Sequence, residues 1–303
     1  MANPLRRSRC WANLSRRRTA VAAAAHIVAF IAPTLVDSHF PEVARGAARL
    51  LRPRGYTLMI SSSESDPEAE TQALDLLLAC RQVDGLIIAS CRPSSDTEIL
   101  ARMERLQLPY VLVERGFPDL TAAFVGWDEE AIGMAATEHL IVRGCRHIAH
   151  IRGPENSSGQ GRFQGYAAAL TRFNLKVCPG YVVAGGSTSA AGYQAMRKLL
   201  AVNPRLDGVV CYNDAVAVGA VRAILESGLE IPYDLEVIGA GNLHYTEVLR
   251  VPLSTVDLNS GLAGERAAEL LADLIEGRPP QPSQKILIPF QLIPRESSRA
   301  IAV

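Results

Sequence analysis

The residues best suited to catalysis or metal binding do not complete any of the usual motifs. Asp128, Glu129 and Glu130 follow one another and could provide general acid/base chemistry. Three acids at the start of a helix are, however, more often capping and dipole residues. His147 and His150 are three residues apart in a strand-like run, where they face opposite sides and cannot share a metal ion. We therefore expect no catalytic residues, no metal and no cofactor.

Two glycine-containing segments resemble enzyme motifs but are incomplete. Residues 185–189 (GGSTS) begin like a nucleophile elbow and lack its closing glycine. Residues 239–241 (GAG) follow a predicted strand like the opening of a dinucleotide-binding loop, but His244 stands where the third glycine belongs. A tight turn between a strand and a loop is the simpler interpretation of both.

The elements that must position any site alternate along the chain. Short apolar, β-rich runs are separated by segments with helical periodicity, such as the face formed by Val43, Ala47 and Leu51. This order is typical of an α/β protein whose parallel sheets are covered by helices on both faces. The predicted strands are 27–32, 57–60, 85–89, 110–113, 148–151, 208–212 and 236–239.

An internal repeat indicates two similar lobes. Residues 26–33 (HIVAFIAP) return as 147–154 (HIAHIRGP), and 83–88 (VDGLII) return as 206–211 (LDGVVC), at offsets of 121 and 123. Ligands of open α/β sheets bind at the carboxyl ends of the strands. We therefore expect two Rossmann-like lobes with a ligand cleft between them, the geometry of a hinged binding protein whose lobes close around a small molecule. The expected division is a basic tail (1–25), an N-terminal lobe (26–127 plus 258–287) and a C-terminal lobe (128–257 plus 288–303).

The charge distribution and the cysteines of the chain indicate in which cellular compartment the protein is found. The 31 basic residues balance 31 acidic ones, but six arginines precede the first acid, Asp37, so a basic tail leads an acidic remainder. The six cysteines are widely spaced without a CxxC pair, which favours reduced cytoplasmic thiols: Cys10, Cys80, Cys91, Cys145, Cys178 and Cys211. Residues 20–33 are too short an apolar stretch to span a membrane, for which about 20 residues are needed. We expect a cytoplasmic protein without a membrane partner.

Beyond these patterns, the chain resembles the lactose/galactose repressor (LacI/GalR) family of bacterial transcriptional regulators over about residues 26–297. The resembling segments are 31–33 (IAP), 40–46 (FPEVARG), 54–56 (RGY), 83–87 (VDGLI), 136–141 (ATEHLI), 153–154 (GP), 161–166 (GRFQGY), 213–220 (NDAVAVGA) and 252–256 (PLSTV). The resemblance implies a periplasmic-binding-protein-like fold of type I, a small effector, a homodimer, and DNA binding controlled by that effector.

The resemblance also implies an effector site. His39 and Phe40 match positions where the family has aromatic residues, and Arg162 matches the arginine that binds effector hydroxyls or carboxylates. Further candidates lie in the same loop, at hinge or cleft positions, or after the late strand: Ser157, Ser158, Asp128, Asp214 and Asn242. Gly241 replaces an acid that is usual in the family, which suggests a changed or bulkier effector. The resemblance itself implies a small, carbohydrate-like ligand.

The N-terminus departs from the family pattern. Family members begin with a helix-turn-helix domain, whereas only 25 residues precede His26 here. Arg16, Arg17 and Arg18 resemble the end of the hinge and could contact DNA phosphates, but without a reading helix that contact would be nonspecific. We expect DNA binding only if a helix-turn-helix lies upstream or on a partner chain.

Two other functions remain open from the sequence. Basic residues before the apolar stretch 20–25 resemble an export signal, so the chain could be the periplasmic solute-binding protein of an ABC transporter. Cleavage there would, however, cut close to the predicted first strand. An α/β enzyme that uses Asp128 or Asp214 is the third possibility, and the lack of a complete catalytic motif counts against it.

Overall fold

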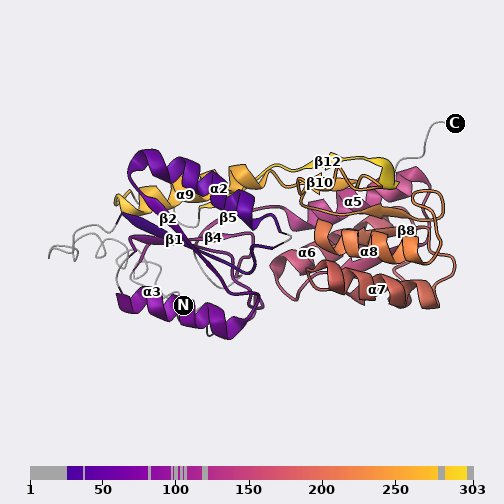
Figure 1. Cartoon of the computed structure of the whole chain (residues 1–303), viewed down its shortest axis with the longest axis horizontal. Coiled ribbons are helices and arrows are strands. Elements are labelled where there is room, and N and C mark those ends of the chain that lie inside the picture. The colour runs from indigo at the N-terminus through magenta and orange to yellow at the C-terminus, as the bar shows by residue number, and fades with distance from the viewer. Residues whose placement is uncertain are drawn as a thin grey trace, which may run out of the picture. The chain divides into compact units, whose positions relative to one another are not determined.

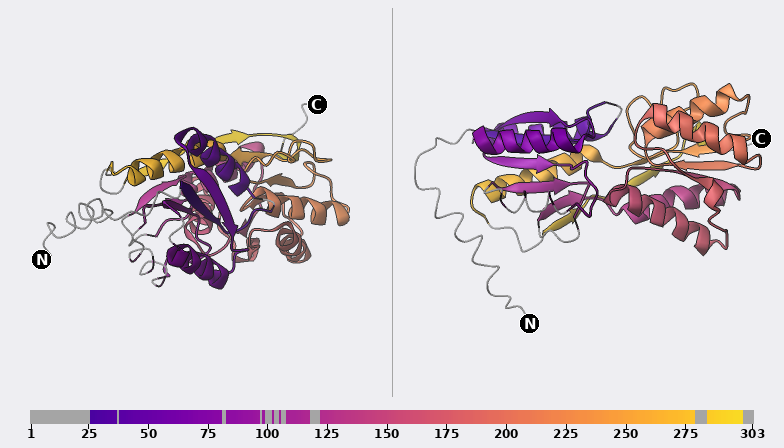
Figure 2. Two further views of the ribbon diagram at one scale, coloured as in Figure 1. Left: turned by 60° about the vertical axis from the view of Figure 1, so that its left-hand side comes forward. Right: turned by 90° about the horizontal axis from the view of Figure 1, so that it is seen from below.

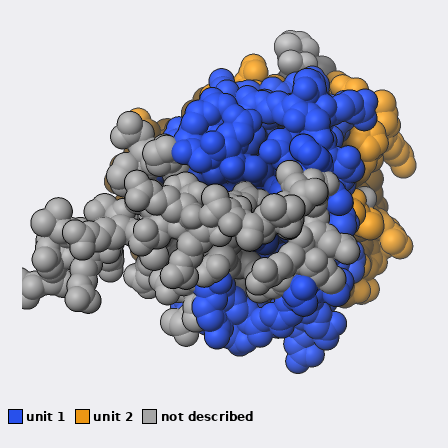
Figure 3. All heavy atoms as spheres, turned by 90° about the vertical axis from the view of Figure 1, so that its left-hand side faces the viewer, with its two compact units in different colours: residues 1–33, 42–125, 261–286 blue, residues 34–41, 126–260, 287–303 orange. Residues whose placement is uncertain are grey.

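The chain folds around two parallel β-sheets, each in its own unit. The computed structural model describes residues 26–36, 38–80, 83–96, 98, 102, 105, 108–117, 122–278 and 284–298. Unit 1 draws on residues 1–33, 42–125 and 261–286, and unit 2 on residues 34–41, 126–260 and 287–303, coloured separately in Figure 3.

Unit 1 contains a six-stranded sheet with the order β11-β5-β4-β3-β1-β2, in which the neighbours from β5 to β2 pair in parallel. Its strands are β1 (Ile27–Ala32), β2 (Thr57–Ser62), β3 (Gly85–Ile88), β4 (Tyr110–Val113), β5 (Ala123–Gly126) and β11 (Lys285–Leu287). The helices α2 (Phe40–Leu51) and α9 (Ser260–Ile275) run side by side over the sheet, and α3 (Pro67–Cys80) covers its other face (Figure 1). Helices on both faces explain why β1, β3 and β4 are apolar throughout.

Unit 2 contains a four-stranded parallel sheet with the order β7-β6-β8-β9. Its strands are β6 (Ile148–Arg152), β7 (Val182–Ala184), β8 (Gly208–Cys211) and β9 (Glu236–Ile238), beside a separate antiparallel pair, β10 (Thr255–Asp257) and β12 (Gln291–Ile293). Four helices pack on the sheet in two pairs: α5 (Glu129–Arg143) with α6 (Ser157–Arg172), and α7 (Ser189–Val202) with α8 (Asp214–Glu226). Figure 2 shows the same helices from two further directions.

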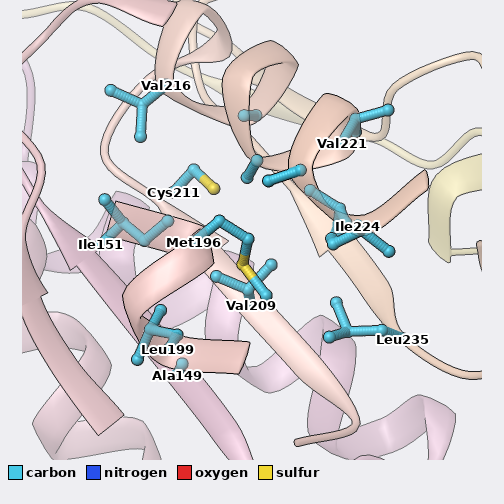
Figure 4. Packing of buried hydrophobic residues seen from close by; sticks show 14 of the residues in the cluster. Ala149, Ile151, Met196, Leu199, Val209, Cys211, Val216, Val221, Ile224 and Leu235 are labelled. Atoms are coloured by element: carbon cyan, nitrogen blue, oxygen red, sulfur yellow. The ribbon is translucent and has the colours of Figure 1, made fainter. Parts of the chain in front are cut away.

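One hydrophobic core of unit 2 lies between the sheet and the pair α7 and α8. Met196 and Leu199 on α7 and Ile224 on α8 belong to one buried cluster with the strand residues Ile151 and Val209, and all five are 0% exposed (Figure 4). Burial of such side chains stabilises the fold by about 1.5–3 kcal/mol each, so this cluster is a main source of the stability of unit 2.

Glycines allow the paired helices of unit 2 to cross at short distance. A Cβ on Gly133 of α5 would overlap the carbonyl oxygen of Arg162 on α6, and one on Gly165 would overlap that of Glu130. Gly192 of α7 and Gly219 of α8 likewise allow these two helices to approach closely, because a Cβ at either position would overlap a backbone carbonyl oxygen of the other helix. The close crossing of α5 and α6 brings the first turn of one helix against the second turn of the other.

The predicted α/β fold with parallel sheets agrees with the structure. All seven predicted strands are present, and the repeated segments form the directly paired strands β1 and β3 in unit 1, and β6 and β8 in unit 2. The prediction missed β5, β7, β10, β11 and β12, which have only three or four residues each. None of the described helices has the length and apolar character needed to cross a membrane.

Candidate functional site

The polar side chains of unit 2 gather at the carboxyl edge of its sheet. Each strand-to-helix loop at this edge ends in a residue that caps the following helix: Asn156 for α6, Thr188 for α7 and Asn213 for α8. The side-chain oxygen of each cap accepts a hydrogen bond from a backbone N–H of the first turn. Several helix N-termini therefore meet where ligands of open α/β sheets bind.

Arg162 is the most constrained charged residue at this edge. Its Nε donates to Glu129 Oε2 at 2.7 Å, and its Nη1 donates to the carbonyl oxygen of Tyr212 at 2.6 Å. The guanidinium also lies 4.8 Å from the centre of the Tyr212 ring. Arg162 is 3% exposed and Glu129 is 8% exposed, so the ion pair is buried. Three directions of contact hold the guanidinium in one orientation.

A chain of hydroxyl and amide groups continues from Tyr212. Ser158 Oγ lies 2.9 Å from the Tyr212 hydroxyl and donates to Asn156 Oδ1, also at 2.9 Å. Asn156 is 1% exposed, and its Nδ2 has no hydrogen-bond partner among the residues that the structure describes. Buried polar groups are normally satisfied, so an amide donor in this position is well suited to bind a ligand oxygen. These residues and Arg162 with Glu129 are called the Arg162 network below.

Asp128 and Ser157 flank this network. Asp128 is exposed and caps α5 by accepting a hydrogen bond from Ala131 N at 2.9 Å, which confirms its predicted place at the helix start. Ser157 is the first residue of α6 and is half-buried. Contact of either residue with an effector stays a prediction.

His39 and Phe40 belong to an aromatic group in unit 2. The two ring centres are 4.4 Å apart, and His39 meets Trp127 edge-on at 5.5 Å. Trp127 Nε1 donates to the carbonyl oxygen of Leu258 at 2.6 Å. Phe40 is 3% exposed and begins α2, whereas His39 is half-buried. The structure thus brings both residues together as an aromatic group, and their predicted stacking on an effector remains untested.

Asp214 and Asn242 belong to a second network at the edge of unit 2. Asp214 is fully buried and accepts hydrogen bonds from Thr255 Oγ1 at 2.6 Å and from Leu243 N at 2.8 Å. Burial raises the pKa of Asp214 to about 6, although both hydrogen bonds act to lower it. Asn242, in the left-handed region at φ 51°, accepts from Arg295 Nη2 at 2.8 Å. Both predicted residues therefore hold the loop after β9 in place.

Sequence patterns gave no signal for a polar group at the carboxyl edge of the sheet of unit 1. Glu70 on α3 is fully buried and accepts hydrogen bonds from Ser90 Oγ and Cys91 N, both at 2.6 Å. Arg115 Nη1 donates to the carbonyl oxygen of Ser90 at 2.9 Å. Burial and the nearby Glu70 raise the pKa of the Cys91 thiol to about 12, so this cysteine is a poor nucleophile. Glu114, just after β4, has φ 64°, an uncommon conformation for a non-glycine residue.

Sequence patterns equally gave no warning of Glu129, Asn156 and Tyr212 in the Arg162 network. Glu129 was considered only within the acidic cluster at a helix start, Asn156 was not singled out, and Tyr212 was placed at the end of a predicted strand. Within the described residues, no three histidine, cysteine or acidic side chains are grouped to hold a metal ion. The Arg162 network provides hydrogen-bond donors in fixed positions, and His39 and Phe40 provide aromatic rings. Such groups are suited to binding a ligand.

Comparison with known proteins defines the class. The family model of the periplasmic binding protein-like domain matches residues 137–298. The chain is 30% identical over 272 residues to the HTH-type transcriptional repressor CytR of Escherichia coli strain K12, covering 89% of this chain and 79% of that protein. It is also 30% identical over 246 residues to the HTH-type transcriptional repressor PurR of Histophilus somni strain 129Pt, covering 80% and 73%.

Solved structures of transcriptional regulators are similar to this chain. A transcriptional regulator CelR-cellobiose complex superposes with a TM-score of 0.84 at 26% identity, covering 98% of this chain and 92% of that one. The transcription regulator CcpA of Lactococcus lactis gives a TM-score of 0.82 at 25% identity, covering 90% and 99%. The fold is therefore that of transcriptional regulators of the LacI type. The chain belongs to the LacI family of transcriptional regulators and carries their periplasmic-binding-protein-like domain.

Family membership favours the transcriptional regulator among the functions that the sequence left open. The relatives are transcriptional regulators and not enzymes, and the solute-binding alternative is not favoured. Arg16, Arg17 and Arg18, predicted to contact DNA, lie outside the residues that the structure describes.

Proposed function

We propose that the Arg162 network binds a small, carbohydrate-like effector that controls transcription. The carrying observation is the fixed guanidinium of Arg162, which Tyr212 and Ser158 connect to Asn156 with its buried Nδ2 donor. Donors in fixed geometry suit the hydroxyl and ring oxygens of a sugar. The similarity to a regulator solved with cellobiose supports this class of ligand. The lobes that would close on the effector are 26–127 with 258–287, and 128–257 with 288–303.

In this proposal each residue of the network has a distinct role. Arg162 and Asn156 donate to effector oxygens, Ser158 orients the Asn156 amide, and the Tyr212 ring supports the guanidinium from one side. His39 and Phe40 supply an apolar face for the effector, with Asp128 and Ser157 as further polar contacts. Asp214 and Asn242 shape the loop after β9.

We also propose that the protein acts as a homodimer. β2 is the last strand in the described order of the sheet of unit 1 and carries two exposed apolar side chains, Met59 at 40% and Ile60 at 43%. An exposed edge strand with apolar side chains is a natural surface for a second copy. In unit 2, Val248 is 77% exposed and Tyr233 is 64% exposed, so each is a further apolar position that a second copy could cover.

Operator recognition then falls to a helix-turn-helix, either upstream of the described region or on a partner chain, in the cytoplasm where transcription takes place. The mass of the intact protein from its native cell tests this part. A species heavier than 32.7 kDa is expected if a reading domain precedes this chain, and a lighter one would support processing instead.

Calorimetry tests the effector site. Carbohydrates that raise the melting temperature of the protein would be titrated into wild type, Arg162→Gln and Arg172→Gln. Arg172 is a matched control because it lies on the same helix in an exposed ion pair with Glu138. We expect Arg162→Gln to lose binding and Arg172→Gln to retain it. Equal affinity for all three proteins would overturn the assignment, and Ser158→Ala repeats the test if Arg162→Gln does not fold.

A further inference from the structure

A buried ion pair balances the charge of Arg162 inside the proposed site. Glu129 Oε2 lies 2.7 Å from Arg162 Nε, and the two side chains are 8% and 4% exposed. An unbalanced arginine in a binding site attracts carboxylates and phosphates, because its fork matches their two oxygens. Here the positive charge already has a carboxylate partner from the protein itself.

The backbone fixes Glu129 in this position. Asp128 caps α5, so Glu129 is the first helical residue, where the helix dipole favours a negative charge. Gly161, the neighbour of Arg162 in sequence, faces Glu129 so closely that a Cβ on Gly161 would lie 2.6 Å from the Cβ of Glu129. The absence of a side chain at 161 therefore leaves room for the carboxylate to reach the guanidinium.

The pair changes which ligands the site accepts. A ligand anion near Arg162 would also lie near the Glu129 carboxylate, and like charges in a poorly solvated site repel each other strongly. A neutral ligand with hydroxyl groups meets no such repulsion and can still accept hydrogen bonds from donors of the network. From the family resemblance alone, Arg162 could bind either hydroxyl or carboxylate groups of an effector. The position of Glu129 disfavours the carboxylates.

We infer that Glu129 is a specificity-determining residue, which restricts the Arg162 network to neutral, hydroxyl-bearing effectors and excludes carboxylates and phosphates. The inference rests on the proposed function of the network as the effector site. It deepens that function by assigning the charge class of the effector to one residue.

Inorganic phosphate is the probe for the first experiment. It would be titrated into wild type, Glu129→Gln, Glu130→Gln and the double variant Glu129→Gln/Arg162→Gln by calorimetry at constant ionic strength. Glu130→Gln is the matched control, because it makes the same chemical change one residue further along, at an exposed position. We expect Glu129→Gln to bind phosphate at least tenfold more tightly than wild type, Glu130→Gln to match wild type, and the double variant to lose the gain.

Two results would overturn the inference: equal phosphate affinity in folded Glu129→Gln and wild type, or a gain that persists in the double variant. Circular dichroism and the melting temperature establish that each variant is folded.

A second measurement uses wild type alone, in case Glu129→Gln does not fold. Matched neutral and anionic ligands would be compared: cellobiose with cellobionate, glucose with glucuronate, and ribose with ribose 5-phosphate. For any pair of which a member binds, we expect the neutral ligand to bind at least tenfold more tightly than the anionic one. Tighter binding of an anionic member would refute the role of Glu129 while leaving the effector function intact. If no carbohydrate binds, the proposed effector class fails, and the phosphate titration still decides the role of Glu129.

Discussion

Gly161 on α6 stands directly against Glu129 on α5, with room for a hydrogen atom and not for a methyl group. A Cβ at position 161 would lie 2.6 Å from the Cβ of Glu129 and 3.4 Å from the Glu129 carbonyl carbon. This contact couples the packing of two helices to the placement of the carboxylate that pairs with Arg162. Helix packing and the electrostatics of the site are therefore set by the same pair of residues.

Gly161→Ala is expected to destabilise the protein by about 1–3 kcal/mol, because the added methyl group forces α5 and α6 apart. The effect would be measured by denaturant unfolding. Gly261→Ala is the control, since a Cβ at Gly261 meets no atom within 4 Å. A Gly161→Ala protein as stable as wild type would show that the helix pair adjusts without cost.

Asn156 has two functions that one substitution separates. Asn156→Asp keeps the oxygen that caps α6 but replaces the unpartnered Nδ2 donor, so it should fold and bind effector at least tenfold more weakly. Asn156→Ala removes the cap as well and should also lose about 1 kcal/mol of stability. Calorimetry and thermal melting measure the two effects. Unchanged affinity in Asn156→Asp would remove the amide from the site.

His150 makes unit 2 sensitive to acid. It is fully buried, and desolvation lowers its pKa to about 3, assisted by the positive charges of Arg152 and Arg162. The unfolded chain, with a histidine pKa near 6.5, binds the proton more tightly, so stability declines as the pH falls from about 6.5 towards 3. His150→Phe retains a ring beside Tyr166 and should reduce the loss between pH 7 and 5 by about 2 kcal/mol. An unchanged pH dependence of denaturant unfolding would contradict this.

Asp214 should have the opposite effect to His150 on how stability depends on pH. Because burial raises its pKa to about 6, the folded protein binds this proton more tightly than the unfolded chain does. Its contribution to stability therefore grows as the pH falls from about 6 to 4. Relative to wild type, Asp214→Asn should lose about 1 kcal/mol more on going from pH 7 to 5. Denaturant unfolding at the same series of pH values measures this difference. If Asp214→Asn lost less stability than wild type at low pH, as His150→Phe should, the raised pKa of Asp214 would be refuted.

The dimer proposal predicts that a charge on the edge strand β2 disrupts association. Ile60→Glu should convert the dimer to a monomer in light scattering coupled to size-exclusion chromatography, because the carboxylate would be desolvated at the interface. Val142→Glu is the matched control, at a 75% exposed apolar position on α5. A dimer that persists in Ile60→Glu would place the interface elsewhere, with the surface around Val248 as the next candidate.

Much of the fold follows from local sequence patterns. The predicted strand at residues 27–32 is observed as β1 with the same bounds, and residues 110–113 as β4, because a strand covered on both faces is a continuous apolar run. The strands β7, β10 and β12 were missed because they have three residues each and are partly exposed, whereas the equally short β9 is buried throughout and was predicted. The helix start at Asp128 was also correctly predicted, since capping is a local interaction.

The candidate site shows where local patterns stop being sufficient. The sequence by itself determined the elements, the repeat and the arginine that resembles an effector ligand. Only the tertiary structure decided the partners of that arginine: Glu129 is 33 residues away and Tyr212 is 50 residues away. These contacts depend on how closely α5 and α6 cross and on which strand lies beside β6. Periodicity and capping act over a few residues, whereas such contacts arise from packing between elements, which no local pattern records.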